Sequence, residues 1–464
     1  MPDTLRPLRA ILVSSPSALR ADCMSPRAGS RTVRRFTALG LLLALGGAAW
    51  AETSPYYVGG SLGLTRISNP YRASDGTPFP DSAPKDDSYT TLSLLAGIDQ
   101  PIGRERLYGT ARLSDNRWQH NTNLNGRSYD LSGGLDWEAS NRWTGTLKAG
   151  FNENLALSPV EQLGPSSVAT VFDRNVLNTD TVDATIQYGV ASRISAVAGI
   201  GYRRVGYSSF AFSYLDYSQK NASFSLNYTE GGALTLGIGP HFTRGSYPTA
   251  TCRFDSTGAP DPRYPCTGDT SDAYTRHDLD FTAKWIASGA SNFDSRLSFG
   301  RERHSDFQRN KNTDGFTGFI LWNWTPTGKL HVNANLQRDT DQNVYFYSLG
   351  TGSPSTYSTD SSSVTTALAI GVQYDVSSKI GATASVRYAR RPMTNSYGVS
   401  SAAPTVYTGT DNTTQLALGA TWAPTRSTQL GCDISTENRT TTSLQVSSPY
   451  STNSIGCNAQ FTLR

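Results

Sequence analysis

The sequence has no long hydrophobic run beyond its first 51 residues, and nothing there approaches the ~20 consecutive apolar residues of a membrane-spanning helix. It also has no glycine-rich phosphate loop, no cluster of metal-ligating residues, and no motif that ties a histidine to a serine. These absences argue against a helical membrane protein and against the common catalytic classes. We therefore expect neither an enzyme nor a bound cofactor or metal.

An excess of one charge is also missing. The formal net charge is +4, but seven of the 41 basic and two of the 37 acidic residues lie in the first 51 positions. The remainder has 34 basic and 35 acidic residues, so it is almost neutral. A neutral chain offers no basic surface for a polyanion, and we expect no nucleic-acid partner.

The N-terminal segment has the features of a secretory signal peptide. Basic residues lie at 31–35, an apolar stretch follows at 36–48, and Ala49 and Ala51 are small residues at the positions that a signal peptidase reads. About 13 apolar residues are too few for a transmembrane anchor, which is the alternative. We place the presequence at 1–51 with cleavage after Ala51, and Met24 is an alternative start of translation.

What the chain does contain is strict alternation of apolar and polar residues. Leu279, Phe281, Ala283 and Trp285 alternate with Asp278, Asp280, Thr282 and Lys284, and the same period of two recurs to the C-terminus. Period two is typical of strands with one apolar and one polar face. A soluble sandwich could show it, but the length and regularity of the runs and the signal peptide favour a barrel. The negative mean hydropathy agrees, because only alternate residues of a barrel face lipid.

Aromatic residues end many of these runs immediately before a short polar turn, as expected for the interfacial girdle of a membrane barrel. The girdle residues are Trp137, Trp143, Tyr188, Tyr228, Trp285, Trp324, Tyr374 and Trp422. Eight hairpins and two terminal strands predict an all-β, transmembrane, antiparallel up-and-down β-barrel of about 18 strands over 52–464, with 16 as the alternative. Short turns face the periplasm and long loops face the exterior of a Gram-negative outer membrane. Outer-membrane lipid and the barrel assembly machinery are the expected partners.

The polar positions of the strands predict charged side chains in a wide lumen. They are Arg112, Lys148, Arg203, Lys284, Arg296, Arg387, Asp130, Asp278 and Asp280. A ring of one charge would select permeating solutes. The signs are mixed here, so ordinary paired lumen charges are the simpler interpretation, and no selectivity filter is assigned.

Four cysteines remain after the presequence. Cys252 and Cys266 share one long loop, where an oxidising exterior favours a disulfide. Cys432 and Cys457 lie symmetrically about the predicted 439–450 loop, so a regular hairpin places them opposite each other. We predict a second disulfide there, with two buried free thiols as the alternative.

Several segments resemble the EpsL family of outer-membrane proteins. The resemblance rests on Asp99-Gln-Pro-Ile-Gly-Arg, Leu135-Asp-Trp-Glu, Tyr274-Thr-Arg-His-Asp-Leu and Trp324-Thr-Pro-Thr-Gly-Lys-Leu, and on their order from about Tyr56 onward. The resemblance implies a part in exopolysaccharide biosynthesis and export, linked to exosortase and PEP-CTERM sorting. The expected role is a passive conduit for the polymer. The expected partners are the polysaccharide and periplasmic export components. A general diffusion porin and a non-conducting scaffold are the alternatives. One departure is the end Phe461-Thr-Leu-Arg464, because barrel assembly signals usually finish on an aromatic.

Overall fold

The computed structural model describes residues 54–77, 84–156, 160–163, 168–171, 174–189, 192–248, 271–305, 313–340, 364–397, 405–444 and 446–463. The expected presequence and the Cys252–Cys266 pair lie outside these residues. The account below concerns the unit Thr53–Arg464.

Eighteen antiparallel strands form one sheet. Its first nine strands are β1 (Tyr56–Ile67), β2 (Asp87–Ile102), β3 (Glu105–Trp118), β4 (Gly126–Ser140), β5 (Trp143–Leu155), β8 (Val176–Tyr188), β9 (Ile194–Tyr207), β10 (Tyr217–Glu230) and β11 (Leu234–Tyr247). The other nine are β12 (Asp272–Ser288), β13 (Ser291–His304), β14 (Thr313–Thr327), β15 (Leu330–Thr340), β16 (Val364–Asp375), β17 (Ile380–Tyr397), β18 (Thr405–Trp422), β19 (Thr428–Thr441) and β20 (Tyr450–Leu463).

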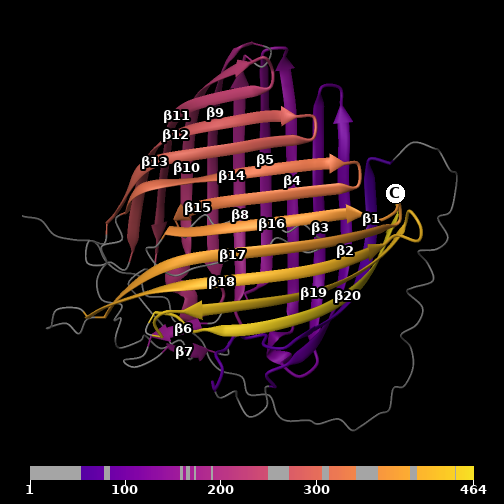
Figure 1. Ribbon diagram of the computed structural model, residues 1–464, viewed down its shortest axis with the longest axis vertical. Helices are drawn as coiled ribbons and strands as arrows, with labels where there is room; N and C mark the ends of the chain where they lie inside the picture. Colours follow the sequence, from indigo (N-terminus) through magenta and orange to yellow (C-terminus); the bar gives the residue numbers. More distant parts are fainter. Residues whose placement is uncertain are drawn as a thin grey trace, which may run out of the picture. The chain divides into compact units, whose positions relative to one another are not determined.

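The sheet closes on itself, because β1 pairs with β20 as well as with β2. Every other strand pairs with its neighbours in sequence, except that β5 pairs directly with β8. Figure 1 shows the two walls that result, with the early strands crossing behind the late ones, as expected for strands tilted to a barrel axis. The prediction of an 18-strand up-and-down barrel is confirmed, and the 16-strand alternative is wrong.

The alternation seen in the sequence separates the two faces of this wall. On β1 and β2 the leucines Leu62 and Leu92 are opposite each other and largely exposed, whereas Ser61 and Ser93 are opposite each other and buried. The exposed apolar set therefore covers the outside, and the polar set lines the lumen. Among the described residues no helix is long and apolar enough to cross a membrane.

Tight turns follow closely after the predicted girdle residues Tyr188, Trp285 and Trp422. The longer connections contain structure that the sequence did not predict. Two short 3-10 helices follow strands at the loop end, η1 (Thr122–Leu124) after β3 and η2 (Phe210–Leu215) after β9. The connection between β5 and β8 contains a separate two-stranded sheet, β6 (Val160–Leu163) with β7 (Val168–Val171).

The two 3-10 helices pack on the inner wall near the loop end of the barrel. Leu124 of η1 lies in a buried cluster with Ile67, Tyr71 and Trp118. Phe212 of η2 belongs to a second cluster, and its ring stacks on that of Tyr207 with the centroids 5.5 Å apart. The described part of the loop-side mouth therefore has an apolar lining.

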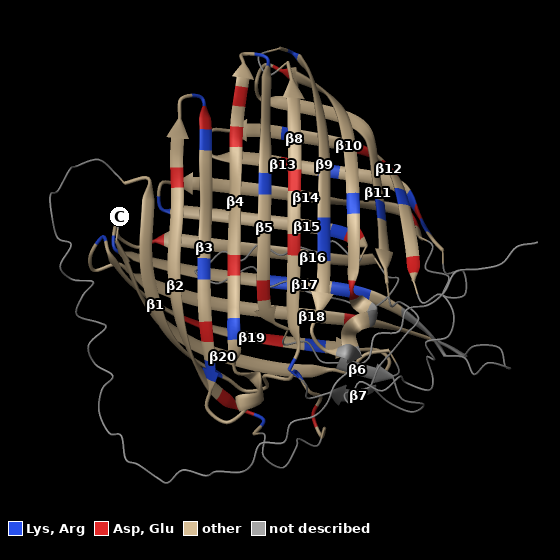
Figure 2. Ribbon diagram, turned by 180° about the vertical axis from the view of Figure 1, so that it is seen from behind, with Lys and Arg blue, Asp and Glu red and all other residues tan. Residues whose placement is uncertain are grey.

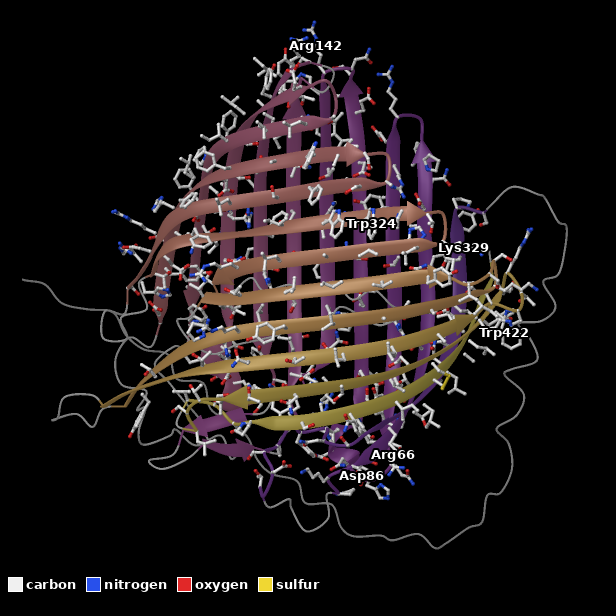
Figure 3. The ribbon with its side chains drawn as sticks, viewed as in Figure 1. Arg66, Asp86, Arg142, Trp324, Lys329 and Trp422 are labelled. Atoms are coloured by element: carbon white, nitrogen blue, oxygen red, sulfur yellow. A yellow bond between two sulfur atoms is a disulfide. The ribbon has the colours of Figure 1, made fainter. Side chains whose placement is uncertain are left out.

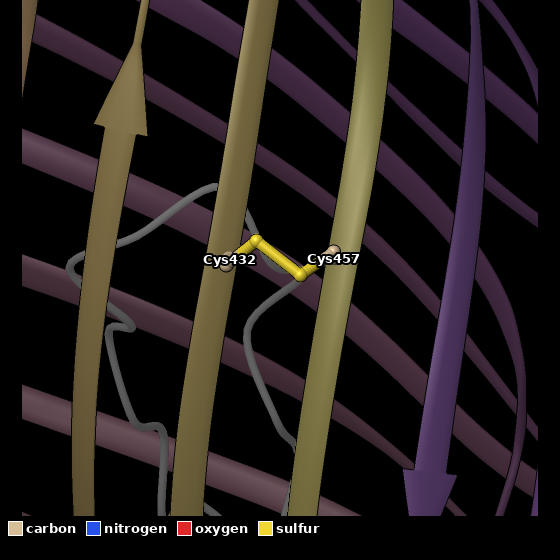
Figure 4. Close-up of a disulfide and its surroundings, with 2 residues drawn as sticks. All are labelled: Cys432 and Cys457. Carbon is tan, nitrogen blue, oxygen red and sulfur yellow. A yellow bond between two sulfur atoms is a disulfide. The ribbon is translucent and has the colours of Figure 1, made fainter.

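Cys432 and Cys457 are directly opposite on β19 and β20 and form a disulfide (Figure 4). Both are exposed on the outer face, in line with Ile434 and Ile455. The prediction of a cross-strand disulfide is confirmed, and the free-thiol alternative is wrong.

Candidate functional site in the barrel lumen

The outer face of the barrel has an apolar belt. On β11 the outward positions from Leu234 to Phe242 are all apolar. A run of eight residues is about 26 Å long along the strand, and at a tilt of roughly 40° it spans about 20 Å of height. With the length of the side chains at both ends added, this height approaches the ~25 Å apolar band of membrane barrels.

Aromatic residues border the belt on its tight-turn side. Figure 3 labels Trp324 and Trp422 near the tight turns, and Arg66 and Asp86 at the opposite, loop-side end. The rings of Trp143 and Tyr188 lie 4.7 Å apart across two strands, and most of the predicted girdle side chains are exposed on the outer face. An apolar belt with such an edge around a closed barrel is suited to lipid. The protein is an outer-membrane β-barrel.

The lumen is the candidate functional site, and its two halves differ. On β12 the inward side chains of Asp272, Tyr274, Arg276, Asp278 and Asp280 are buried, whereas Lys284, near the tight turn, is exposed. The same gradient recurs on other strands, and Figure 2 shows charges of both signs along the wall. The lumen is therefore open toward the tight turns and narrow in the loop-side half.

One group of buried charges in this narrow zone lies on β12 and β13. Arg276 donates to Asp278 through Nε and Nη2 at 2.8 Å, and its Nη1 lies 3.7 Å from Glu302. His304 contacts Asp272 at 2.7 Å and Glu302 at 3.0 Å. We call these five residues the β12–β13 network. Its charges are nearly all removed from water, and they are held by one another.

A second group lies on β17–β20 and a loop residue. Glu437 accepts from Arg72 Nε at 2.9 Å and from the Tyr450 hydroxyl at 2.6 Å. Arg391 Nη2 donates to Asp411 at 2.8 Å, and the side chains are 10% and 2% exposed. These residues, the β17–β20 network, join segments as far apart as residues 72 and 437. Together the two networks make a constriction with charges of both signs.

The structure divides the predicted lumen charges between the two halves. Arg203, Arg387, Asp278 and Asp280 are buried in the narrow zone, and Arg296 lies half-buried beside the Phe319 ring at 5.6 Å. The others lie in more open parts of the lumen. There Arg112 is directly opposite Asp130, Lys148 is directly opposite Asp183, and Lys284 is 3.9 Å from Asp294.

Sequence reasoning missed several members of both networks. They are Arg276, Glu302, Arg391, Asp411 and Glu437. Their signal was available, because each has the same parity along its strand as another inward polar residue of that strand, such as Asp278 for Arg276 and Arg387 for Arg391. The pairing across strands was not available from parity alone.

Outside the strands, one carboxyl at the loop-side mouth has a displaced pKa. Burial raises the pKa of Asp216 to about 6, although its Oδ1 accepts the Tyr207 backbone N–H at 2.7 Å. No group of three or more His, Cys, Asp or Glu residues in the described part of the chain is arranged to hold a metal ion.

No protein-family model and no curated protein matches the sequence. Among solved structures, the outer membrane protein OpdK of Pseudomonas aeruginosa is similar at 11% identity and a TM-score of 0.43, over 88% of this chain and 99% of that chain. A mutant of the ferric enterobactin receptor PfeA of the same species is similar at 10% identity and a TM-score of 0.41, over 89% and 81%. The siderophore receptor PirA of Acinetobacter baumannii is similar at 8% identity and a TM-score of 0.39, over the same shares. Likenesses this distant add nothing to what the barrel itself shows.

Proposed function

We propose that this barrel is a passive conduit for an exopolysaccharide across the outer membrane. The observation that carries the proposal is the division of the lumen into an open, polar half on the periplasmic side and a charge-lined constriction on the exterior side. The resemblance of the sequence to the EpsL family supports the choice of polymer.

A hydrated glycan suits such a path. Eighteen strands enclose a lumen wider than that of eight-stranded barrels, which their own side chains fill. Hydroxyls, amides and paired charges line the described wall, so a glycan exchanges hydrogen bonds with water for hydrogen bonds with the protein. At the constriction the charges are already paired with one another, so the barrier acts on size and hydration more than on net charge.

The test is a deletion strain complemented with wild type or with the double variant Arg276→Gln/Asp278→Asn. Both substitutions retain hydrogen-bonding groups and remove one buried ion pair from the constriction. Secreted and periplasmic polysaccharide are measured separately, together with uptake of small solutes. We expect the deletion to trap polymer in the periplasm, and the double variant to change the rate of secretion.

Other outcomes contradict the proposal. Unchanged secretion with impaired solute uptake would identify a diffusion porin. Loss of secretion that the double variant restores at the wild-type rate would identify a scaffold, because the lumen would then be irrelevant. The matched control is Lys284→Gln/Asp294→Asn, which removes an exposed pair of β12 and β13 from the open half of the lumen.

A further inference from the structure

The outer face ends in a regular way at its loop side. On β10, β11 and β13, going from the tight turn toward the loop, an outward run of mainly apolar residues is followed by Lys220, Arg244 and Arg301 respectively. On β15 and β17 the corresponding residues are Arg338 and Arg390. Each cation is thus the first charged outward residue above the apolar belt.

These cations are not balanced by acids. Over β10–β17 the outward charges at this level are Lys220, Arg244, Arg301, Arg303, Arg338 and Arg390 against the single acid Asp314. Asp314 pairs with Arg303 at 2.6 Å. Arg301 is directly opposite Asp314 but forms no ion pair with it, and Lys220, Arg244 and Arg390 form none within the described part of the chain.

The opposite side of the barrel differs. At the same level Arg66 pairs with Asp86 at 2.6 Å, Arg117 pairs with Asp115 at 2.8 Å, and Arg127 is directly opposite Asp115. The unbalanced cations therefore belong to one sector, which we call the basic sector. A general excess of arginine at this height of the barrel does not explain the imbalance of charge, because on the opposite side the cations lie beside acids.

Within the basic sector, like charges are neighbours. Lys220 and Arg244 are directly opposite in the β10–β11 register, and such pairs of equal sign destabilise a sheet. The arrangement calls for anions from outside the chain to offset this repulsion.

Aromatic side chains lie immediately below the cations. Phe242 precedes Arg244 on the outer face, and the Arg338 guanidinium lies 4.7 Å from the centre of the Phe316 ring. Apolar rings with cations directly above them match a lipid whose acyl chains end where its charged headgroup begins.

We propose that the basic sector binds the phosphate groups of the phosphorylated glycolipid in the outer leaflet. The loop side of such a barrel faces the exterior, so the cations lie at the headgroup level of that leaflet. Phosphate accepts hydrogen bonds from lysine ammonium and arginine guanidinium groups at once, and neutralises neighbouring like charges. The proposal does not rest on polysaccharide export.

The test uses the refolded full barrel in detergent, with bisphosphorylated lipid A and its phosphate-free form as probes and native mass spectrometry as the readout. The variant is Lys220→Gln/Arg244→Gln/Arg301→Gln, and the matched control is Arg66→Gln/Arg117→Gln/Arg127→Gln. Circular dichroism and the heat-dependent gel shift establish that each barrel is folded.

We expect the basic-sector variant to bind bisphosphorylated lipid A about a hundredfold more weakly than wild type, since each of the three cations near an anionic lipid surface contributes about fivefold. The control variant should bind within about threefold of wild type. Equal binding by wild type and the basic-sector variant would overturn the proposal. Equal binding of the two lipid A forms would also overturn it, because the belt alone would then account for association.

Discussion

The buried pair of Arg276 and Asp278 provides a quantitative test of the constriction. Two 2.8 Å hydrogen bonds join side chains that are only 10% and 3% exposed. Removing one partner of such a pair leaves a buried charge and costs about 3 kcal/mol or more. Glu302, 3.7 Å from Arg276, compensates for part of that loss. We therefore expect Asp278→Asn to lower the free energy of unfolding by about 3 kcal/mol.

A double-mutant cycle isolates the interaction from the other contacts of each residue. Arg276→Gln, Asp278→Asn and the double variant are unfolded in urea after refolding into liposomes, with tryptophan fluorescence as the probe. The expected coupling energy is about 2 kcal/mol, because the double variant no longer has an unpaired buried charge.

The exposed pair of Lys284 on β12 and Asp294 on β13 is the control. At 3.9 Å, with the side chains 70% and 39% exposed, it should give a coupling energy below about 0.5 kcal/mol. Equal coupling energies for the two pairs would refute the inference that the loop-side half of the lumen is a dry, narrow zone.

Three further predictions concern other parts of the barrel. Reducing Cys432–Cys457, which closes a separation of 25 residues, should lower the unfolding free energy by up to about 3 kcal/mol in urea titrations. Gly245→Ala should cost about 1–3 kcal/mol by the same assay, because a Cβ there would lie 2.5 Å from the buried Tyr274 ring. The pKa of Asp216 in the folded protein is about 6, above its ordinary 3.8, so the folded loop favours the protonated carboxyl. Hydrogen-exchange protection of the 208–216 amides should therefore be greatest below pH 4. It should decrease by on the order of 1 kcal/mol as the pH rises through 6.

Each of these has its own control. Cys432→Ser should match the reduced protein, and no difference between oxidised and reduced barrels would contradict the first prediction. Gly289→Ala, where nothing lies within 4 Å of the new Cβ, should leave stability unchanged, and an equal loss at both glycines would contradict the second. Asp216→Asn should abolish the pH dependence of protection after correction for intrinsic exchange, and its persistence would contradict the third.

The fold was accessible from the sequence because each of its rules is local. Period two fixes which side chains face out, so the alternating Leu279, Phe281 and Trp285 were assigned to the apolar face of one strand. All three are exposed on the outer face of β12. The symmetry of one hairpin was enough to pair Cys432 with Cys457. These inferences need no knowledge of distant contacts.

The constriction was less accessible because its contacts are not local. Arg72 and Glu437 meet only because β1 and β20 close the barrel, and no periodicity relates them. The positions of Arg391 and Asp411 along their strands show that both side chains face inward. Their burial, however, depends on contacts with side chains of other strands in the narrow half of the lumen. The packing of η2 against Tyr207 likewise depends on a loop folding back over the wall.

The most direct test of a passive conduit is single-channel conductance in a planar bilayer, with cysteine variants labelled by a bulky maleimide. Lys148 lies in the lumen wall of β5, and Arg142 lies on the tight turn before it (Figure 3). We predict an open channel that is blocked by the strain's own exopolysaccharide but not by a neutral oligosaccharide of similar size. Labelling Lys148→Cys should reduce its conductance, and labelling Arg142→Cys should not. A barrel that never conducts, or a conductance equally indifferent to the polymer and to both labels, would contradict the account.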